Sequence, residues 1–411
     1  MLLAARDHRS VFASPYTLLD AALVVWLLLA GLMLVPVPAR TRLAIAPASA
    51  TVDRTLFLNT PPDPSAAPPR PLSIDPSASA WAIALGAALV LLFWSARTIV
   101  ASGGLRASVR GVAWISLALT TLALVQHGAT PQLIYGFIRP IGRNPTPFGP
   151  FASRNDFATW LIMVLPLVAG YAAARVEARR RSEEPPAVDA VVDATALWLG
   201  ASMLFIAAAL VVAISRSGLV GAAAGMAALL VLARRRMSRS GWGWTAAGTT
   251  LVLAVAATYA SWQALAQRME ETLAGGLGGR REIWERTWAM ASDFRMTGVG
   301  VGAYERAMTV YQQTPHVFYF NHAHNEYLQL LAEGGVMLAV PAAVAIVAGV
   351  WLIARLLAAD RTAVFWIRSG AAAGMLAVAV QSVWDTGLRM PANAVLFALL
   401  AAIAVHDSER T

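Results

Sequence analysis

The sequence predicts an all-α protein that crosses a membrane many times. Of its 411 residues, 58% are hydrophobic and only 13% are charged, whereas soluble domains carry about 25% charged residues. A soluble globule could not bury this much apolar surface, so part of the solvent must be lipid. The chain contains no cysteine, which excludes disulfides, thiolate metal sites and a cysteine nucleophile.

Ten apolar stretches are long enough to span a bilayer, because about 20 apolar residues form a helix as long as the hydrocarbon core is thick. We expect them to form a single transmembrane domain over residues 1–411. The first stretch follows Arg6 and Arg9 and is long for a signal peptide, so we interpret it as a retained anchor. The stretches lie near 17–36, 81–100, 111–128, 156–175, 195–214, 217–234, 244–262, 335–356, 366–384 and 390–406.

The arginines predict the orientation of the chain. Every basic residue other than histidine is an arginine, and the net charge is +9. The arginines gather in alternate loops, as orientation signals do, so we expect no nucleic-acid partner. Two intervening short turns carry only Arg216 and Arg389. The positive-inside rule therefore puts the arginine-rich loops and both termini in the cytoplasm. Those loops contain Arg97, Arg106, Arg110, Arg175, Arg179, Arg180, Arg181, Arg234, Arg235, Arg236, Arg239, Arg355 and Arg361.

Three longer segments fall on the external, periplasmic face by the same rule. Residues 37–80 are rich in proline, alanine and serine, which is typical of a loop. Residues 129–155 form a second loop, with arginines among prolines and glycines. Residues 264–333 are the longest and most polar segment, and we expect this large loop to carry the functional residues.

An amphipathic helix is expected over residues 280–296. Trp284, Trp288 and Ala291 recur at helical spacing, while charged residues lie elsewhere on the wheel. Glycines precede the helix, and the glycine-rich run at 296–302 ends it. Tryptophans on one face suit the bilayer interface, and packing on neighbouring helices is the alternative.

A histidine-rich run follows this helix. His316, His322 and His324 are three of the six histidines in the chain. Leucines four and seven residues after His324 predict a helix that begins near it, places its imidazole on the buried stripe and ends at the glycine pair starting with Gly334. A histidine pair of this spacing could ligate zinc, but no third ligand follows at helical spacing, so we expect no metal. Two surface histidines in a loop are the plain alternative.

Four elements, in order, resemble signatures of the O-antigen ligase/O-antigen polymerase superfamily, and the resemblance covers most of residues 110–400. It implies a GT-C-like membrane glycosyltransferase fold with ten to twelve spans. The elements are GPFASRNDFATWL at 149–161, the turn Ser215-Arg216-Ser217-Gly218, the element Gly279-Arg280-Arg281-Glu282-Ile283-Trp284 with the glycine run at 298–302, and HAHNEYLQLLAEGG at 322–335.

The resemblance also implies an activity. The family comprises metal-independent glycosyltransferases of the bacterial inner membrane, whose donor glycan is carried on undecaprenyl pyrophosphate. The acceptor is lipid A-core in ligases, another lipid-linked repeat in polymerases, and a Ser or Thr hydroxyl in protein-glycosylating relatives. We therefore expect a role in surface polysaccharide or lipopolysaccharide biosynthesis, with the bilayer, the lipid-linked donor and an acceptor glycolipid, glycan or protein hydroxyl as partners, and with no cofactor.

Arginines can stabilise a pyrophosphate leaving group, because negative charge develops on its oxygens and a guanidinium group binds two of them at once. Arg216 is the sole charge in a tight external turn, where a charge is costly unless it has a function, and snorkelling is the alternative. Arg280 matches the family arginine by its spacing from the tryptophan that follows, and Arg281 is a neighbouring substrate-binding candidate. Arg143 and Arg154 are further candidates for binding phosphate or an anionic glycan, with a solvated loop as the alternative.

A histidine suits the acceptor, whose hydroxyl must lose a proton. The family histidine directly precedes asparagine, which makes His324 the candidate general base and His322 the weaker alternative. Asn325 and Glu326 are candidates for orienting the base or the sugar, and Glu326 is a second candidate base. A single displacement inverts the anomeric configuration, and no paired-carboxylate arrangement indicates a covalent intermediate.

Two other classes of protein compete with the enzyme. A transporter, as in relatives described in bicarbonate uptake, should show ionisable residues near mid-span or broken helices. A non-catalytic envelope-assembly protein would not need histidines and arginines on one face. Mid-span residues here are mostly Ala, Leu and Val, so we favour the enzyme and expect His324, Arg216 and Arg280 to surround one cavity. Asp385 and Arg389 flank the last external turn, where we expect an ion pair.

Overall fold

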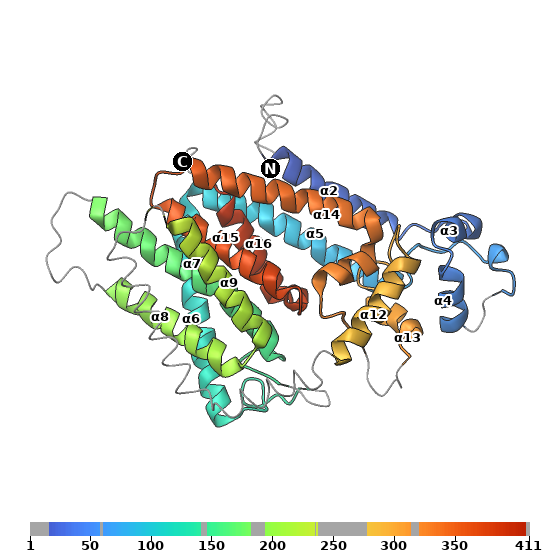
Figure 1. The fold of residues 1–411 in the computed structure, drawn as a ribbon, viewed down its shortest axis with the longest axis horizontal. Coiled ribbons are helices and arrows are strands. Elements are labelled where there is room, and N and C mark those ends of the chain that lie inside the picture. The colour runs from blue at the N-terminus through green and yellow to red at the C-terminus, as the bar shows by residue number, and fades with distance from the viewer. Residues whose placement is uncertain are drawn as a thin grey trace. The chain divides into compact units, whose positions relative to one another are not determined.

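The computed structural model shows an all-α membrane protein (Figure 1). It describes residues 16–57, 61–140, 146–181, 194–234, 236, 278–313 and 320–407. Within these ranges β pairing is limited to isolated bridges, and 6 helical stretches are long and apolar enough to cross a membrane. The predicted fold class, a polytopic helical membrane protein, is therefore confirmed.

The helices follow the predicted spans. The span expected at 244–262 lies outside the described residues. Two apolar helices, α2 and α16, have only 16 and 14 residues, so at 1.5 Å per residue they are shorter than the hydrocarbon core is thick. The helices are α2 (Thr17–Leu32), α5 (Pro76–Ile99), α6 (Leu105–Ala129), α7 (Arg154–Arg181), α8 (Ala194–Ala213), α9 (Arg216–Ala233), α14 (Glu326–Ala359), α15 (Val364–Gln381) and α16 (Pro391–Ala404).

A short break divides α5 from α6. Pro76–Ala129 is a helical stretch of 54 residues. An unbroken helix of that many residues would be roughly 80 Å long, far more than a hydrocarbon core of about 30 Å. The π-helical turn Val100–Gly104 interrupts it, because Ser102 has ψ of 17° and Gly103 has φ of 93°. The stretch therefore contains both of the spans predicted in this region.

The chain divides into two compact units. Unit 1 comprises residues 1–91 and 275–354, and unit 2 comprises residues 92–274 and 355–411. In unit 2, α15 packs against α7, α9 and α16, and α8 packs against α6 and α7 (Figure 1). Unit 2 therefore consists mainly of membrane-spanning helices around α15.

Glycines bring the helices of unit 2 into backbone contact. A Cβ atom at Gly170 of α7 would collide with the carbonyl oxygen of Trp366 in α15. A Cβ at Gly374 would lie 2.6 Å from the carbonyl oxygen of Met163, and one at Gly225 would lie 3.0 Å from that of Ala373. Small residues at such contacts are typical of helix packing in membranes, where close approach replaces the hydrophobic effect.

Unit 1 contains a hydrophobic core built from two segments expected to be loops. Within 37–80 the chain forms α3 (Ala39–Ile45) and α4 (Ser49–Leu56), and within 264–333 it forms α12 (Gly278–Asp293) and α13 (Tyr304–Tyr311). The segment 37–80 is therefore partly helical, because its scattered apolar residues are buried against the later segment. The shared core includes Ala46, Val52, Ile74, Met290, Phe294, Val299, Tyr304, Met308 and Ala332.

Candidate functional site

Arg216 is the first residue of α9 and follows a tight turn. Ile214 takes a left-handed conformation, with φ of 47°. The Ser215 hydroxyl then caps α9 by accepting a hydrogen bond from the amide of Gly218 at 3.2 Å. A Cβ at Gly218 would lie 2.7 Å from the Cβ of Ala158 in α7, so only glycine fits there. This turn leaves the Arg216 side chain exposed at the end of an apolar span.

A buried carboxylate contacts the same turn. The Ser217 hydroxyl donates a hydrogen bond to Asp385 at 3.1 Å, and the amide of Thr386 donates to the same carboxylate at 2.9 Å. Asp385 is only 4% exposed. From the sequence we expect Asp385 to pair with Arg389, and nothing in the sequence links Asp385 to the Arg216 turn. An acidic residue directly after an apolar span was the signal available for it.

Arg154 starts α7 at the same end of unit 2. Its side chain is half-buried, and its amide donates to the carbonyl of Thr146 at 2.9 Å. Asn393 of α16 donates to the carbonyls of Asp156 and Gly387, both at 2.9 Å. The turn before α16 is therefore hydrogen-bonded to the first turns of both α7 and α9. These bonds bring the N-terminus of α7, with Arg154, close to that of α9, with Arg216. The other candidate of the preceding loop, Arg143, lies outside the described residues.

The candidate arginines of unit 1 lie in the first turns of α12. Arg280 is half-buried, whereas Arg281 is exposed and pairs with Glu285 at 2.8 Å. Trp288 is 60% exposed, so it does not lie on the buried face of α12 as the packing alternative requires. That face is formed by Ile283, Thr287, Met290 and Ala291, and Phe294 directly after the helix is buried beside it.

A hydrogen bond from Trp284 joins α12 to the histidine-rich run. Its indole Nε1 donates to the carbonyl oxygen of Ala323 at 2.9 Å. The amide of Ala323 donates to the side chain of Gln329 at 2.9 Å, and Gln329 in turn donates to Glu333 at 3.0 Å. Side chains from two helices therefore hold both backbone groups of Ala323, the residue directly before His324.

His324 lies just before α14 in a left-handed backbone conformation, with φ of 49°. The helix begins at Glu326, and the Asn325 side chain accepts the amide of Leu328 at 3.0 Å, as an N-cap does. The helix therefore begins near His324, as expected, but His324 precedes it and does not lie on its buried stripe. A non-glycine residue in this conformation is strained, and such strain concentrates at functional sites. His322, His324 and Glu326 are all half-buried.

The glycine pair breaks α14 as predicted. Gly335 has φ of 55° and ψ of −161°, which is not helical. The amides of Val299 and Gly300, from the glycine-rich run, donate to the carbonyls of Ala332 and Glu333, both at 2.9 Å. The run therefore packs directly on the break, and the two motifs of unit 1 form one packed element.

Metal-ligating side chains do not cluster in the part of the chain that the structure describes. No group of three or more histidine and acidic residues there could hold a metal ion. One histidine of the predicted run, His316, lies outside the described residues. The charged groups available to the candidate site are thus its arginines, its histidines and the acidic side chains Asp385 and Glu326.

The fold and these polar helix ends define a polytopic helical membrane protein with candidate chemistry at the ends of its spans. Residues 201–343 match a protein-family model described as O-antigen ligase. The match covers about a third of the chain; it supports the resemblance to the O-antigen ligase/polymerase superfamily and, with it, glycan transfer of that general type. The matched region includes Arg216, Arg280 and His324. No curated protein matches the chain significantly.

Proposed function

We propose that the chain transfers a glycan from undecaprenyl pyrophosphate to an acceptor hydroxyl at the periplasmic face of a bacterial inner membrane. It would act as an O-antigen or surface-polysaccharide ligase or polymerase. The hydrogen bond from Trp284 to Ala323 carries this proposal, because it holds the helix of Arg280 against the residue before His324. A cation for the pyrophosphate and a base for the hydroxyl therefore belong to one packed element.

The proposed step is a single displacement. The acceptor hydroxyl gives its proton to the imidazole of His324 while its oxygen attacks the anomeric carbon. The bond from that carbon to the pyrophosphate oxygen breaks, and undecaprenyl pyrophosphate leaves with the electron pair. The configuration at the anomeric carbon is inverted. No metal is required, because arginines supply the positive charge that the leaving group needs.

The candidate residues have different roles in this step. Arg216 and Arg280 bind the pyrophosphate oxygens with their planar guanidinium forks. Asn325 caps α14, so its role is to position His324. His322 and Glu326 flank the base and are proposed to bind the sugars. In unit 2, Arg154 is a further phosphate-binding candidate, and Arg281 in unit 1 is another.

The distribution of charge supports an enzyme over a transporter. The charged residues of α7 lie near its two ends, and none lies between Asp156 and Arg175. The helix α8 contains no charged residue. A transport pathway through these helices would need polar or ionisable groups near their middle. Transfer at the membrane surface needs such groups only at the helix ends.

His324→Ala tests the proposed base. In proteoliposomes supplied with a lipid-linked glycan and acceptor, we expect glycan transfer to fall by about 100-fold or more, because a positioned general base contributes at least about this much. His127→Ala is the matched control, since His127 is exposed at the end of α6, outside the candidate site. Full activity in His324→Ala, with the protein present in the membrane, would contradict the assignment.

Deletion of the gene distinguishes the possible acceptors. Accumulation of full-length lipid-linked polymer indicates a ligase, whereas accumulation of single lipid-linked repeats indicates a polymerase. An unchanged pool of lipid-linked glycan and of surface polysaccharide would count against both.

A further inference from the structure

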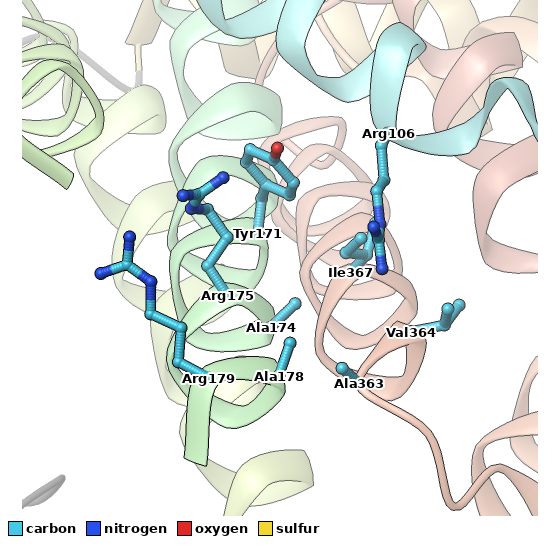
Figure 2. A pocket seen from close by; sticks show the side chains of 9 residues that line it. All are labelled: Arg106, Tyr171, Ala174, Arg175, Ala178, Arg179, Ala363, Val364 and Ile367. Atoms are coloured by element: carbon cyan, nitrogen blue, oxygen red, sulfur yellow. The ribbon is translucent and has the colours of Figure 1, made fainter. Parts of the chain in front are cut away.

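A basic cavity lies at the other end of unit 2. It has a volume of about 280 Å³ and is formed by α6, α7 and the start of α15. Figure 2 shows Arg106 extending from α6 toward Ile367 of α15, while Tyr171, Arg175 and Arg179 follow one another along α7. The last three are spaced four residues apart, so they share one face of the helix.

The cavity carries three positive charges, and no acidic residue is among those described as lining it. Two described acidic side chains near the cavity form ion pairs with arginines that do not line it. Glu177 of α7 forms an ion pair with Arg181 and accepts a hydrogen bond from the Trp366 indole, and Asp360 forms a buried ion pair with Arg368. Three arginines that line one cavity favour an anion, because the planar fork of an arginine matches phosphate oxygens.

The cavity is separated from the Arg154 end of unit 2 by the thickness of a membrane. Arg154 begins α7, and Arg175 follows 21 residues later, which is roughly 32 Å along a helix. A bilayer has a hydrocarbon core of about 30 Å. Arg154 and Arg175 therefore lie at opposite headgroup levels, and the positive-inside rule assigns the Arg175 end to the cytoplasmic leaflet.

The surroundings of the cavity indicate a lipid instead of a soluble anion. Val364 and Ile367 form part of its wall. Val176, directly after Arg175, is 53% exposed, and Trp114 and Ile115 of α6 are exposed as well. Apolar side chains left exposed on membrane helices face acyl chains. When the headgroup of a lipid occupies the cavity, its acyl chains can thus lie against these exposed apolar side chains.

We propose that this cavity binds the phosphate headgroup of an anionic phospholipid from the leaflet opposite Arg154. Sites for drug-sized ligands typically measure about 300–1,000 Å³, so a cavity of about 280 Å³ suits a small headgroup and excludes a lipid-linked oligosaccharide. The Arg106, Arg175 and Arg179 guanidinium groups bind the phosphate. The Tyr171 hydroxyl is placed to donate to a headgroup oxygen.

Native mass spectrometry of the full chain in detergent tests the proposal. Dioleoyl-phosphatidylglycerol should bind the wild-type chain more tightly than dioleoyl-phosphatidylcholine. In the variant Arg106→Ala/Arg175→Ala/Arg179→Ala, we expect phosphatidylglycerol affinity to fall roughly 10- to 100-fold, since each basic residue near an anionic lipid surface contributes about five-fold. Unchanged affinity in this variant would overturn the proposal.

The matched control removes three arginines that do not line the cavity. Arg110→Ala/Arg180→Ala/Arg361→Ala has the same net charge and removes exposed arginines from the same side of unit 2. It should keep wild-type affinity for phosphatidylglycerol. An equal loss in both triple variants would mean that binding follows overall charge and not the cavity, and would overturn the proposal.

Two further measurements separate the possible occupants. Glycerol 1-phosphate, which has the headgroup but no tails, should compete with phosphatidylglycerol only at far higher concentration, and equal competition would identify a soluble-anion site instead. A photoactivatable phosphatidylglycerol should label peptides 171–179 and 363–367 of the wild-type chain. Because this labelling needs no variant, labelling elsewhere without enrichment there would overturn the proposal even if the triple variant failed to fold.

Discussion

At the scale of single residues, the motifs predicted the chemistry but not the geometry. The histidine-asparagine pair predicted His324 as the candidate base, but not its left-handed backbone. That conformation depends on the hydrogen bonds to Ala323 from Trp284 and Gln329, which come from other elements. The contact of Asp385 with Ser217 spans 168 residues. Neither hydrophobic periodicity nor local spacing carries information about contacts at such separations.

The backbone strain at His324 can be measured by comparing two substitutions. His324→Gly removes the steric cost of a left-handed conformation, whereas His324→Ala keeps it. We expect the glycine variant to be about 1 kcal/mol more stable than the alanine variant, in thermal unfolding followed in detergent. Both should lack transfer activity. Equal stability of the two variants would show that the residue is not strained.

Tyr311 supplies a pH-dependent contribution to stability. Its hydroxyl donates to Asp293 at 2.7 Å, and burial, together with this hydrogen bond, raises the pKa of Tyr311. Because the folded chain binds this proton more tightly than the unfolded chain does, the contribution is complete below pH ~10, the unfolded tyrosine value, and is lost as the pH rises above it.

The variant Tyr311→Phe should therefore be less stable than wild type by about 1 kcal/mol at neutral pH, the typical net contribution of one hydrogen bond. The difference between the two proteins should shrink above pH ~10, when the wild-type tyrosine must ionise on unfolding. Thermal unfolding midpoints measured at several pH values check this. A difference that grows in alkali would contradict it.

At the scale of elements, the spans were predictable and the helices of the external segments were only partly so. Hydropathy identified α7, α8 and α9 because each is long and apolar. In α12 the pattern left open whether the tryptophan face meets the bilayer interface or packs on neighbouring helices, and Trp288 is exposed. Two neighbouring sets of residues in α12, one containing Trp288 and one containing Thr287, both recur at the helical period. Contacts with distant segments bury the set that contains Thr287. The helices α3 and α4 are short, and hydrophobic periodicity did not predict them, because their few apolar residues are buried by a distant segment.

The break in α14 offers a paired test of helix geometry. A Cβ at Gly335 would lie 2.6 Å from the backbone of Gly298, and Gly335 has a positive φ, whereas no atom lies within 4 Å of a Cβ at Gly349 in the same helix. We expect Gly335→Ala to lower the free energy of unfolding by about 2 kcal/mol or more. Gly349→Ala should leave it unchanged or raise it by up to about 1 kcal/mol.

Denaturant unfolding of both variants in detergent measures this difference. Equal stability of Gly335→Ala and Gly349→Ala would contradict the described break. Loss of transfer activity in Gly335→Ala alone is also expected, because the break holds the glycine-rich run beside the segment that carries His324.

At the scale of the whole molecule, composition alone predicted the fold class, which is confirmed, and arginine placement predicts an orientation. The division into two units was not predictable, because it depends on contacts between segments more than 200 residues apart, such as those of 37–80 with 264–333. Hydropathy measures how well each helix fits lipid. It does not measure which helices contact one another.

The absence of native cysteine makes the predicted orientation directly testable. Ala152 and Arg361 are exposed, just before α7 and α15 respectively. A membrane-impermeant maleimide should label Ala152→Cys in intact spheroplasts, and should label Arg361→Cys only after permeabilisation, because the two sites lie on opposite faces. The reverse pattern would overturn the assignment of the arginine-rich loops to the cytoplasm.

The glycine contacts between α7 and α15 limit how this protein can move. Domains often shift by the sliding of packed helices, which requires side chains that change rotamer as ridges pass one another. At Gly170 and Gly374 the facing groups are backbone atoms, and these cannot change rotamer. Backbone contact at these positions therefore opposes axial sliding, and we expect the two helices to move as one rigid body. Any movement that admits a lipid-linked donor or releases a product has to occur in other elements.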